Sequence, residues 1–244
     1  MTTLLENEKI EDLLCDGLKI IQSKKLYRFN ADSVILANCL FGAEQKSLCE
    51  IGAGSGVISL LATKKYAPKS VVAVEVQQVF ANMCTRSVEL NGLCDKIKVV
   101  CCDVSHFAQT NQNAFDVVVC NPPYRKVSKN CVDLSKQICT EELLLTLPKL
   151  AKSASLLLKE KGTFVACFPY DRLDEMMVCF KQYNLPLAKV LPVCSKMGNA
   201  PRIAVVWAIK GSNEPLEVLP CLVELDQFGK ESEQMKRLVA TQRL

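Results

Sequence analysis

Four residues, Asn121, Pro122, Pro123 and Tyr124, follow the apolar run 115–120. Proline cannot donate to a sheet ladder, so we expect a buried strand to end here. An asparagine oxygen and a carbonyl held by proline can both accept hydrogen bonds from one NH2 group, which directs its lone pair toward an electrophile. The tyrosine offers a face on which a planar base or amide can stack. We predict that these residues catalyse the modification of a planar amino group; the plain alternative is a rigid turn with a surface tyrosine.

Three glycines, Gly52, Gly54 and Gly56, lie between an expected strand and an expected helix. Their GxGxG spacing differs from the dinucleotide pattern GxGxxG, but glycine still lets the backbone approach a ligand closely. Glu75 ends the next strand, where a carboxylate can accept hydrogen bonds from both hydroxyls of a ribose. Asp103 ends the third strand and can meet an adenine amino group. The set predicts a nucleotide-like cofactor, whereas the alternative is a tight turn followed by two helix-capping carboxylates.

Glu50 stands two residues before the first of these glycines. Its negative charge would repel a phosphate but suits an ammonium group, so we expect an amino-acid moiety here. The expected cofactor is therefore S-adenosylmethionine, with S-adenosylhomocysteine as its product. A nicotinamide oxidoreductase is less compatible, because the glycine spacing differs and the sequence offers no obvious hydride-transfer site.

Strand-like and helix-like segments alternate from about residue 47 onward, a pattern that predicts the α/β class. We expect a doubly wound, mostly parallel seven-stranded sheet covered by helices. Its last strand should be antiparallel, because residues 187–194 and 202–211 both read as strands and no helix separates them.

Two helices outside this simple alternation are also expected. One covers 31–42, begins at Asn30 or Asp32 as its cap, and is closed by its final glycine. The other covers about 134–160, and Pro148 should kink or restart it.

The chain divides into three parts on these patterns. Residues 1–29 are expected to form an N-terminal extension that covers the cofactor site. Residues 30–210 should form the main domain, and 211–244 a C-terminal tail.

Composition restricts the class of protein further. The chain has 244 residues, a formal net charge of +4, fourteen cysteines without a CxxC pair, and a single histidine, His106. The cysteines lie in apolar segments, so we expect most of them to be reduced core residues, and a metal site lacks its usual ligand spacing. With no export signal and no apolar run of about 18 residues, the sequence predicts a cytoplasmic, monomeric protein without membrane or metal.

Basic residues gather beside the Asn-Pro-Pro-Tyr segment and near the start of the chain. They are Lys24, Lys25, Arg125, Lys126 and Lys129. Solvated surface is the ordinary interpretation of such clusters. Their position next to the expected site suggests instead that they grip the phosphates of an RNA.

Together, EIGAGSG, VVAVE, CCD and FDVVVCNPPY resemble the class I S-adenosylmethionine-dependent amino-group methyltransferases, which have a Rossmann-like fold. Within that class, DGLKIIQSKKLYRFNADSVILANCL and KMGNAPRIAVVWAIKG resemble the bacterial tRNA1(Val) (adenine-37-N6)-methyltransferase family. The resemblance covers roughly residues 20–210. It implies N6 methylation of an adenine in tRNA, expected at position 37 of tRNA-Val. The resemblance also implies that this adenine is held by Asn121, Pro122, Pro123 and Tyr124.

The resemblance also implies a set of cofactor-binding residues, and it places the segment 27–32 over the cofactor. The set comprises Arg28, Asp32, Glu50, Gly52, Ala53, Gly54, Gly56, Glu75, Val76, Asp103, Val104 and Asn121.

One departure from the family and several rival functions stay open. Members of the family often carry an Arg-His-Glu run where this chain has ICTEE at 138–142, which leaves the substrate contacts undecided. A protein glutamine N5-methyltransferase or an rRNA guanine N2-methyltransferase would need the same amino-group chemistry. Only about 46 residues precede the first expected strand, too few for the helical substrate domain of the glutamine enzymes. A non-catalytic RNA-binding module is the alternative from a different class.

Overall fold

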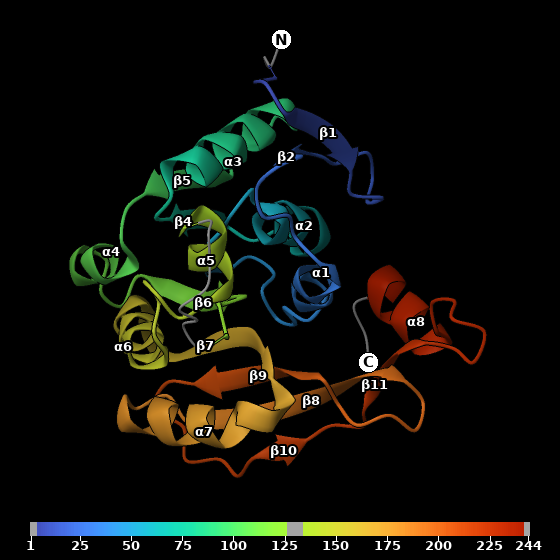
Figure 1. Ribbon diagram of the computed structural model, residues 1–244. Helices are drawn as coiled ribbons and strands as arrows, with labels where there is room; N and C mark the ends of the chain where they lie inside the picture. The colour runs from blue at the N-terminus through green and yellow to red at the C-terminus, as the bar shows by residue number, and fades with distance from the viewer. Residues whose placement is uncertain (1–3, 126–133, 242–244) are drawn as a thin grey trace.

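The computed structural model describes residues 4–125 and 134–241 and has a nine-stranded sheet at its centre (Figure 1). Eight of its strands follow the order β10-β8-β9-β7-β6-β3-β4-β5, and β11 pairs with β8 beside this path. The strands of this sheet are β3 (Ser47–Ile51), β4 (Ser70–Glu75), β5 (Ile97–Cys101), β6 (Phe115–Cys120), β7 (Leu158–Pro169), β8 (Leu187–Lys196), β9 (Ile203–Ile209), β10 (Glu217–Val218) and β11 (Leu222–Leu225).

Strand direction confirms the predicted doubly wound sheet. Strands β3 to β7 pair in parallel, and β9 is antiparallel to both β7 and β8. These seven strands, β3 to β9, form the predicted set, and the last of them in the chain is the antiparallel one. The parallel strands therefore all end at one edge of the sheet, where ligands bind in folds of this kind.

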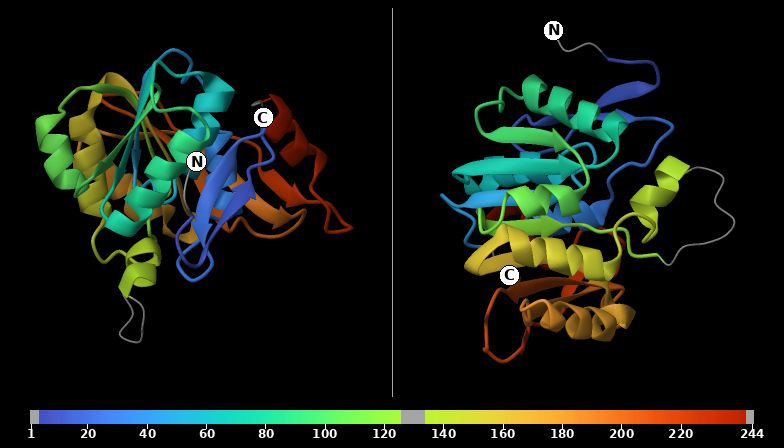
Figure 2. Two further views of the ribbon diagram at one scale, coloured as in Figure 1. Left: turned by 90° about the horizontal axis from the view of Figure 1, so that it is seen from above. Right: turned by 90° about the vertical axis from the view of Figure 1, so that its left-hand side faces the viewer.

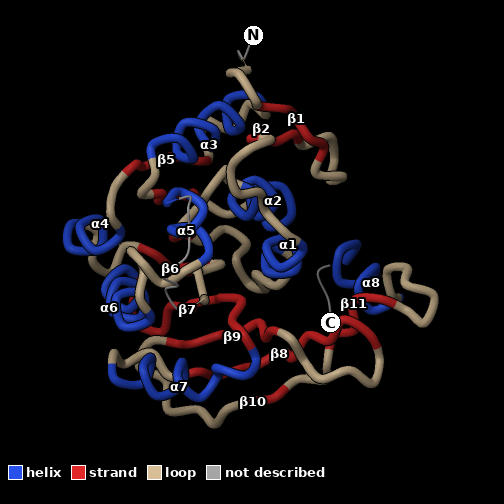
Figure 3. Tube along the Cα trace, viewed as in Figure 1, coloured by secondary structure: helices blue, strands red, loops and turns tan. Residues whose placement is uncertain are grey.

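Two layers of helices cover the sheet, as Figure 2 shows from above and Figure 3 by element type. Side chains alternate along each strand, so that Val117 and Val119 face one layer while Val118 and Cys120 face the other. Core residues of α1, α2, α3 and α8 share the first face, and those of α4, α6 and α7 share the second. The helices are α1 (Ala31–Ala37), α2 (Val57–Tyr66), α3 (Gln78–Leu90), α4 (Val104–Thr110), α5 (Leu134–Thr140), α6 (Leu147–Leu157), α7 (Leu173–Gln182), preceded by the short 3-10 helix η1 (Tyr170–Arg172), and α8 (Glu233–Thr241).

The N-terminal residues form a separate antiparallel hairpin of β1 (Glu8–Asp12) and β2 (Lys19–Ser23). The hairpin packs on α3, where Ile21 lies against Phe80 and Met83. Arg86 of α3 pairs with Glu8 at 2.6 Å and so ties β1 to the same helix. The segment that leaves the hairpin is thereby directed across the carboxyl edge of the sheet.

The C-terminal residues from 211 onward do more than trail from the domain. Strands β10 and β11 both pair in parallel with β8, and Met235 and Leu238 of α8 are buried in the core. The boundary expected at residue 210 stays a prediction, but the segment beyond it extends the sheet to nine strands rather than forming a detached tail.

One helix prediction needs correction and another is confirmed in one of its two forms. Asn30 caps α1 as expected, but the helix ends at Ala37 and not at Gly42; Asn38 caps this end, and its side chain donates to the carbonyl of Val34. The stretch 134–160 is not one helix. It contains α5 and α6, and the second helix begins anew at the Thr146 cap, with proline in its first turn as the restart interpretation requires. His106, the single histidine, lies within α4.

Candidate active site

A pocket of about 280 Å³ lies at the carboxyl ends of β3, β4, β5 and β6. Most of the predicted site residues line it. These are Arg28, Glu50, Gly52, Ala53, Gly54, Glu75, Val76, Asp103, Val104, Asn121, Pro122, Pro123 and Tyr124, with Arg125 at the rim of the same set. Gly56, Asp32, Lys24 and Lys25 do not line the pocket, and Lys126 and Lys129 lie outside the described residues.

The glycine turn after β3 is held against the end of β4. The N–H groups of Gly52 and Ala53 both donate to the carbonyl of Val74, at 2.8 and 3.1 Å. Gly52 and Gly54 have φ angles of 71° and 55°, and a Cβ on either would meet no described atom within 4 Å. The turn therefore presents bare backbone to open space in the pocket, which fits the close approach of a ligand.

Gly56 has a different role from the one the motif suggested. It caps α2 with a φ of 95°, and a Cβ here would lie 2.6 Å from the sulfur of Cys84 on α3. Its glycine identity is required by backbone conformation and by helix packing, and not by contact with the pocket. The GxGxG spacing could not separate these two reasons.

Glu75 at the end of β4 is oriented by the backbone around it. One carboxylate oxygen accepts from the N–H of Gly54 at 2.8 Å and the other from the N–H of Gln77 at 2.9 Å. Burial raises the pKa of this carboxyl, although the backbone donors oppose the rise. Each oxygen keeps a second lone pair, so the fixed carboxylate can still accept from a pair of hydroxyl groups.

Glu50 is 1% exposed and accepts hydrogen bonds from both the N–H, at 2.9 Å, and the hydroxyl of Ser59. Burial raises its pKa to about 8. A cation placed beside it would favour the ionised form, so the residue is suited to an ammonium group and unsuited to a phosphate.

Asp103 follows β5 and caps α4 by accepting from the N–H of Ser105 at 2.8 Å. Its other oxygen pairs with the Lys149 ammonium at 2.7 Å. Burial opposes ionisation, but these two donors together lower the pKa of Asp103. Lys149 comes from α6 and also lines the pocket, so the cation shares the place expected for an adenine amino group.

Asn121 carries the most informative polar group of the pocket. Its side-chain nitrogen donates to the hydroxyl of Ser33 at 2.9 Å. The side-chain oxygen is buried, yet none of the described residues donates a hydrogen bond to it. A buried acceptor without a donor is unfavourable for the fold alone, so this oxygen is available for a donor that a ligand would bring.

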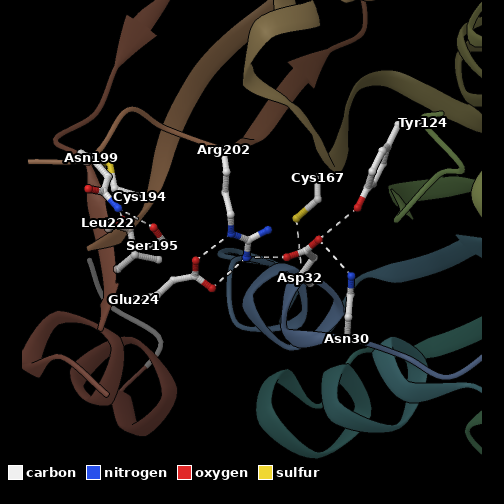
Figure 4. A network of polar contacts seen from close by, with 11 residues as sticks. Asn30, Asp32, Tyr124, Cys167, Cys194, Ser195, Asn199, Arg202, Leu222 and Glu224 are labelled. Atoms are coloured by element: carbon white, nitrogen blue, oxygen red, sulfur yellow. Dashed lines mark hydrogen bonds and ion pairs between the residues drawn. A yellow bond between two sulfur atoms is a disulfide. The ribbon is translucent and has the colours of Figure 1, made fainter. Parts of the chain in front are cut away.

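Tyr124 is held at both its ends. Its hydroxyl donates to Asp32 at 3.2 Å, and its carbonyl accepts from the Arg172 guanidinium (Figure 4 shows the first contact). Burial, and then the charge of Asp32, raises the pKa of the phenol to about 12, so the hydroxyl stays protonated. Asp32 itself does not line the pocket, and its oxygens are engaged by Tyr124, Asn30 and Arg202, so its binding of the cofactor stays a prediction.

Arg125, which follows Tyr124, is hydrogen-bonded through its backbone to the stretch 140–142. The N–H of Arg125 donates to Thr140 at 3.0 Å, and the N–H of Glu142 donates back to Arg125 at 2.9 Å. Arg172 then joins this stretch to η1 through an ion pair with Glu142 at 2.7 Å. The ICTEE segment thus forms part of the pocket wall, where the family often has Arg-His-Glu.

Several pocket residues were not identified from the sequence: Ser33, Gln77, Phe80, Cys139 and Lys149. Gln77 joins the cofactor edge to α5, since its side-chain oxygen accepts from the Ser135 hydroxyl at 2.7 Å. Only Gln77 had a sequence signal, because it directly follows the strand that ends in Glu75.

The predicted basic residues that the structure describes lie on the surface around the pocket. Lys24, Lys25, Arg28 and Arg125 are all exposed. Arg28 and Arg125 also line the pocket, and Arg28 pairs with Glu11 of the hairpin. In the described ranges, no group of three or more His, Cys, Asp or Glu side chains is arranged to hold a metal ion.

Cys194 and Cys221 form a disulfide between β8 and the segment before β11. Over the same ranges, no helix has both the length and the apolar character needed to cross a bilayer.

Comparison with solved structures supports the fold. A protein of Agrobacterium tumefaciens described as a predicted O-methyltransferase superposes with a TM-score of 0.70 at 18% identity, over 85% of this chain and 95% of that one. TYW2 of M. jannaschii, solved in complex with AdoMet, superposes with a TM-score of 0.59 at 14% identity, over 85% and 87% of the two chains. At these identities the likeness concerns the fold.

Sequence comparison narrows the class. Residues 26–146 match the family described as the methyltransferase small domain. The tRNA1(Val) (adenine(37)-N6)-methyltransferase of Bacteroides thetaiotaomicron is 27% identical over 86% of this chain and 89% of its own length. That of Phocaeicola vulgatus is 28% identical over 82% and 84%. Fold and site thus define a class I methyltransferase. Within this class, the chain is similar in sequence to these curated relatives over more than four fifths of its length.

Proposed function

We propose that this protein transfers a methyl group from S-adenosylmethionine to the exocyclic N6 of an adenine in tRNA, at position 37 of tRNA-Val as in the names of its relatives. The observation that supports this most directly is the buried side-chain oxygen of Asn121, which no described residue supplies with a donor. It stands at the tip of β6 beside the pocket that the cofactor residues line.

The pocket residues fit the proposed cofactor. The open backbone at Gly52 and Gly54 leaves room for its amino-acid portion, and Glu50 suits the ammonium group. Glu75 would hold the ribose hydroxyls, and Asp103 would lie toward the adenine end, with Lys149 adjusting to share it. When bound, S-adenosylmethionine supplies an electrophilic methyl group on a positively charged sulfur.

The target amino group is activated by acceptors and not by a strong base. The lone pair of an aryl NH2 is delocalised into the ring, so the nitrogen is a poor nucleophile. If the Asn121 oxygen and the Pro122 carbonyl accept its two hydrogens, the nitrogen moves toward tetrahedral geometry and its lone pair becomes available. The rigid prolines preorganise the second acceptor.

Atoms and charge balance without a histidine. Bound S-adenosylmethionine would supply the methyl group in exchange for its sulfonium charge, which would leave the methylated nitrogen cationic while Asn121 and Pro122 accept its hydrogens. That nitrogen then releases a proton to water and becomes neutral again. Tyr124 provides the face on which the flipped adenine stacks. Its phenol remains protonated at neutral pH, because burial and the charge of Asp32 raise its pKa to about 12.

The exposed basic residues support RNA as the substrate. Lys24, Lys25 and Arg125 are placed to contact phosphates around a target that enters the pocket, and a monomeric cytoplasmic enzyme suffices for this role. Replacing all three with alanine should weaken tRNA binding and flatten its salt dependence while the cofactor affinity is unchanged. Equal losses of tRNA and cofactor affinity would contradict this part of the proposal.

The decisive experiment uses tRNA that lacks the modification, purified protein and cofactor with a labelled methyl group. We expect label in N6-methyladenosine, and digestion of the tRNA should locate it next to the anticodon. Label in guanosine or in a protein glutamine would instead support one of the rival substrates. A tRNA that binds with no label transferred would support the non-catalytic RNA-binding module.

A further inference from the structure

A network of charged side chains lies behind Tyr124, outside the pocket lining (Figure 4). Its centre is Asp32 on α1, whose side chain is only 4% exposed. One carboxylate oxygen accepts from the Tyr124 hydroxyl at 3.2 Å and from the Asn30 amide at 3.0 Å. The other pairs with the Arg202 guanidinium at 2.6 Å. The buried carboxylate thus has partners on both oxygens, and one partner is the tyrosine of the proposed target site.

Arg202 is itself held from two sides. Its guanidinium meets Glu224 of β11 through two parallel contacts, at 2.7 and 2.8 Å. Its backbone N–H donates to Val193 of β8 at 2.9 Å, just before β9 begins. Such a bidentate pair is directional, so the guanidinium has one orientation, and the nitrogen that reaches Asp32 has a fixed place.

The position of β11 in the sheet places Glu224 beside Arg202. Leu222 and Leu225 of this strand lie opposite Val193 and Lys196 in the parallel pairing with β8. This register brings Glu224 to the carboxyl edge of the sheet, where Tyr124 also lies. The C-terminal segment therefore reaches the target side of the site through a chain of three contacts: Glu224 to Arg202, Arg202 to Asp32, and Asp32 to Tyr124.

We propose that Arg202 is a positioning residue for the target pocket: it holds Asp32 so that Asp32 fixes the Tyr124 hydroxyl and with it the tilt of the ring. The inference rests on the proposed function, because it assigns to the ring the task of stacking the target base. The phenolic O–H prefers to lie in the plane of the ring, so an acceptor fixed at one position favours one orientation of the ring. Satisfied polar networks of this kind are rigid, whereas their net contribution to stability is small.

The presence of arginine at position 202, between two carboxylates, favours this role over simple charge neutralisation. A lysine would neutralise Asp32, but its point charge cannot span two carboxylates in a plane as the arginine does. The network also includes Asn30, the cap of α1, so that the helix start and the ring share one acceptor.

A double-mutant cycle tests the proposal with kcat/KM for tRNA as the readout. Arg202→Gln should lower kcat/KM about tenfold or more, because a small displacement of a stacking platform is costly. In a Tyr124→Phe background, which has no hydroxyl to position, the same change should cost less than about twofold. Cofactor affinity should be the same in all four proteins, and Arg202→Lys should recover only part of the loss. An equal loss in both backgrounds, or full activity of Arg202→Gln, would overturn the proposal.

Two further variants cover folding and specificity. If Arg202→Gln does not fold, Glu224→Gln replaces it in the cycle, because it loosens the guanidinium while leaving the Asp32 pair in place. Its smaller loss of kcat/KM must also disappear in the Tyr124→Phe background. Glu217→Gln is the matched control: it removes an exposed 2.8 Å pair with Lys189 that also joins a C-terminal strand to β8, and it should leave kcat/KM unchanged.

A readout without substrate separates this inference from the proposed function. With 3-fluorotyrosine incorporated, the fluorine resonance that disappears in Tyr124→Phe belongs to residue 124. That resonance should shift or broaden in Arg202→Gln and not in Glu217→Gln, whatever the substrate is. An unchanged resonance overturns the positioning role. A changed resonance in a protein whose wild type does not methylate tRNA would support the contact and reject the proposed function.

Discussion

The polar side chains at the two ends of strand β6 differ in whether their oxygens accept hydrogen bonds from the described residues of the protein. At its start, Asp116 accepts from the N–H and the hydroxyl of Ser47, at 2.9 and 2.6 Å, and from the Lys159 ammonium at 2.8 Å. At its end, the Asn121 oxygen is buried without a described donor. One strand, six residues long, thus carries a satisfied acceptor at one tip and an unsatisfied one at the other. The first tip joins β6 to β3 and β7, whereas we propose that the second accepts a hydrogen bond from a ligand.

The largest effect should come from Asn121→Ala. Removing a preorganised group that acts on the transition state should lower kcat by about 100-fold or more. The free energy of unfolding should change by less than about 1 kcal/mol, since the lost bond to Ser33 is offset by removal of the unpaired oxygen. Single-turnover methylation and urea unfolding measure the two quantities. Retained turnover would show that the unsatisfied tip has no catalytic role.

The second test contrasts two glycines of one turn, of which Gly56 is packed and Gly52 is open. Gly56→Ala should destabilise the protein by about 2–4 kcal/mol, because it combines a positive φ with a close contact to Cys84. Gly52→Ala has the strain of positive φ alone, about 1–2 kcal/mol, but should weaken cofactor binding because its Cβ enters the pocket. Urea unfolding and calorimetric titration separate the two, and equal losses of stability would contradict the assignment.

The third test is Asp116→Ala at the satisfied tip. It should lower the free energy of unfolding by about 1–2 kcal/mol, since this partly exposed carboxylate loses its donors, and it should leave kcat unchanged. A fall in kcat comparable with that of Asn121→Ala would remove the distinction between the two ends of the strand.

The smallest effect is a pH dependence due to Glu50. Burial raises its pKa to about 8, so between its ordinary value and pH 8 the folded protein binds more protons at this site than the unfolded chain. The free energy of unfolding therefore falls as pH rises through this window, by at most about 1.4 kcal/mol per pH unit. Glu50→Gln should lack this contribution when urea unfolding is compared at pH 6 and 7, while Glu217→Gln should retain it. Parallel pH profiles for Glu50→Gln and the wild type would contradict the assignment.

The parts of this site that follow from topology could be predicted from the sequence. Glu75, Asp103 and Asn121 each end a strand, and parallel strands end at a common edge, so their convergence needs no knowledge of side-chain packing. The seven strands and their mostly parallel direction, though not their order in the sheet, followed from the same alternation of segments. The break at Pro148 followed from the chemistry of proline.

The remaining features depend on contacts between distant segments. Lys149 meets Asp103 across 46 residues, and Tyr124 meets Asp32 across 92, so no local pattern announces either pair. Gly56 shares its motif with pocket glycines, but its neighbour Cys84 belongs to another helix. The C-terminal strands are too short to be recognised as part of the sheet until their pairing with β8 is seen.

The paired backbone contacts between Arg125 and the stretch 140–142 have a consequence for engineering. They hold Arg125, directly after β6, beside the end of α5. Substitutions in the ICTEE stretch would therefore change the pocket wall without shifting the register of β6, which offers a route to altering the choice of substrate. Since α5 also bonds to Gln77 at the cofactor edge, Ser135 should be kept in such variants.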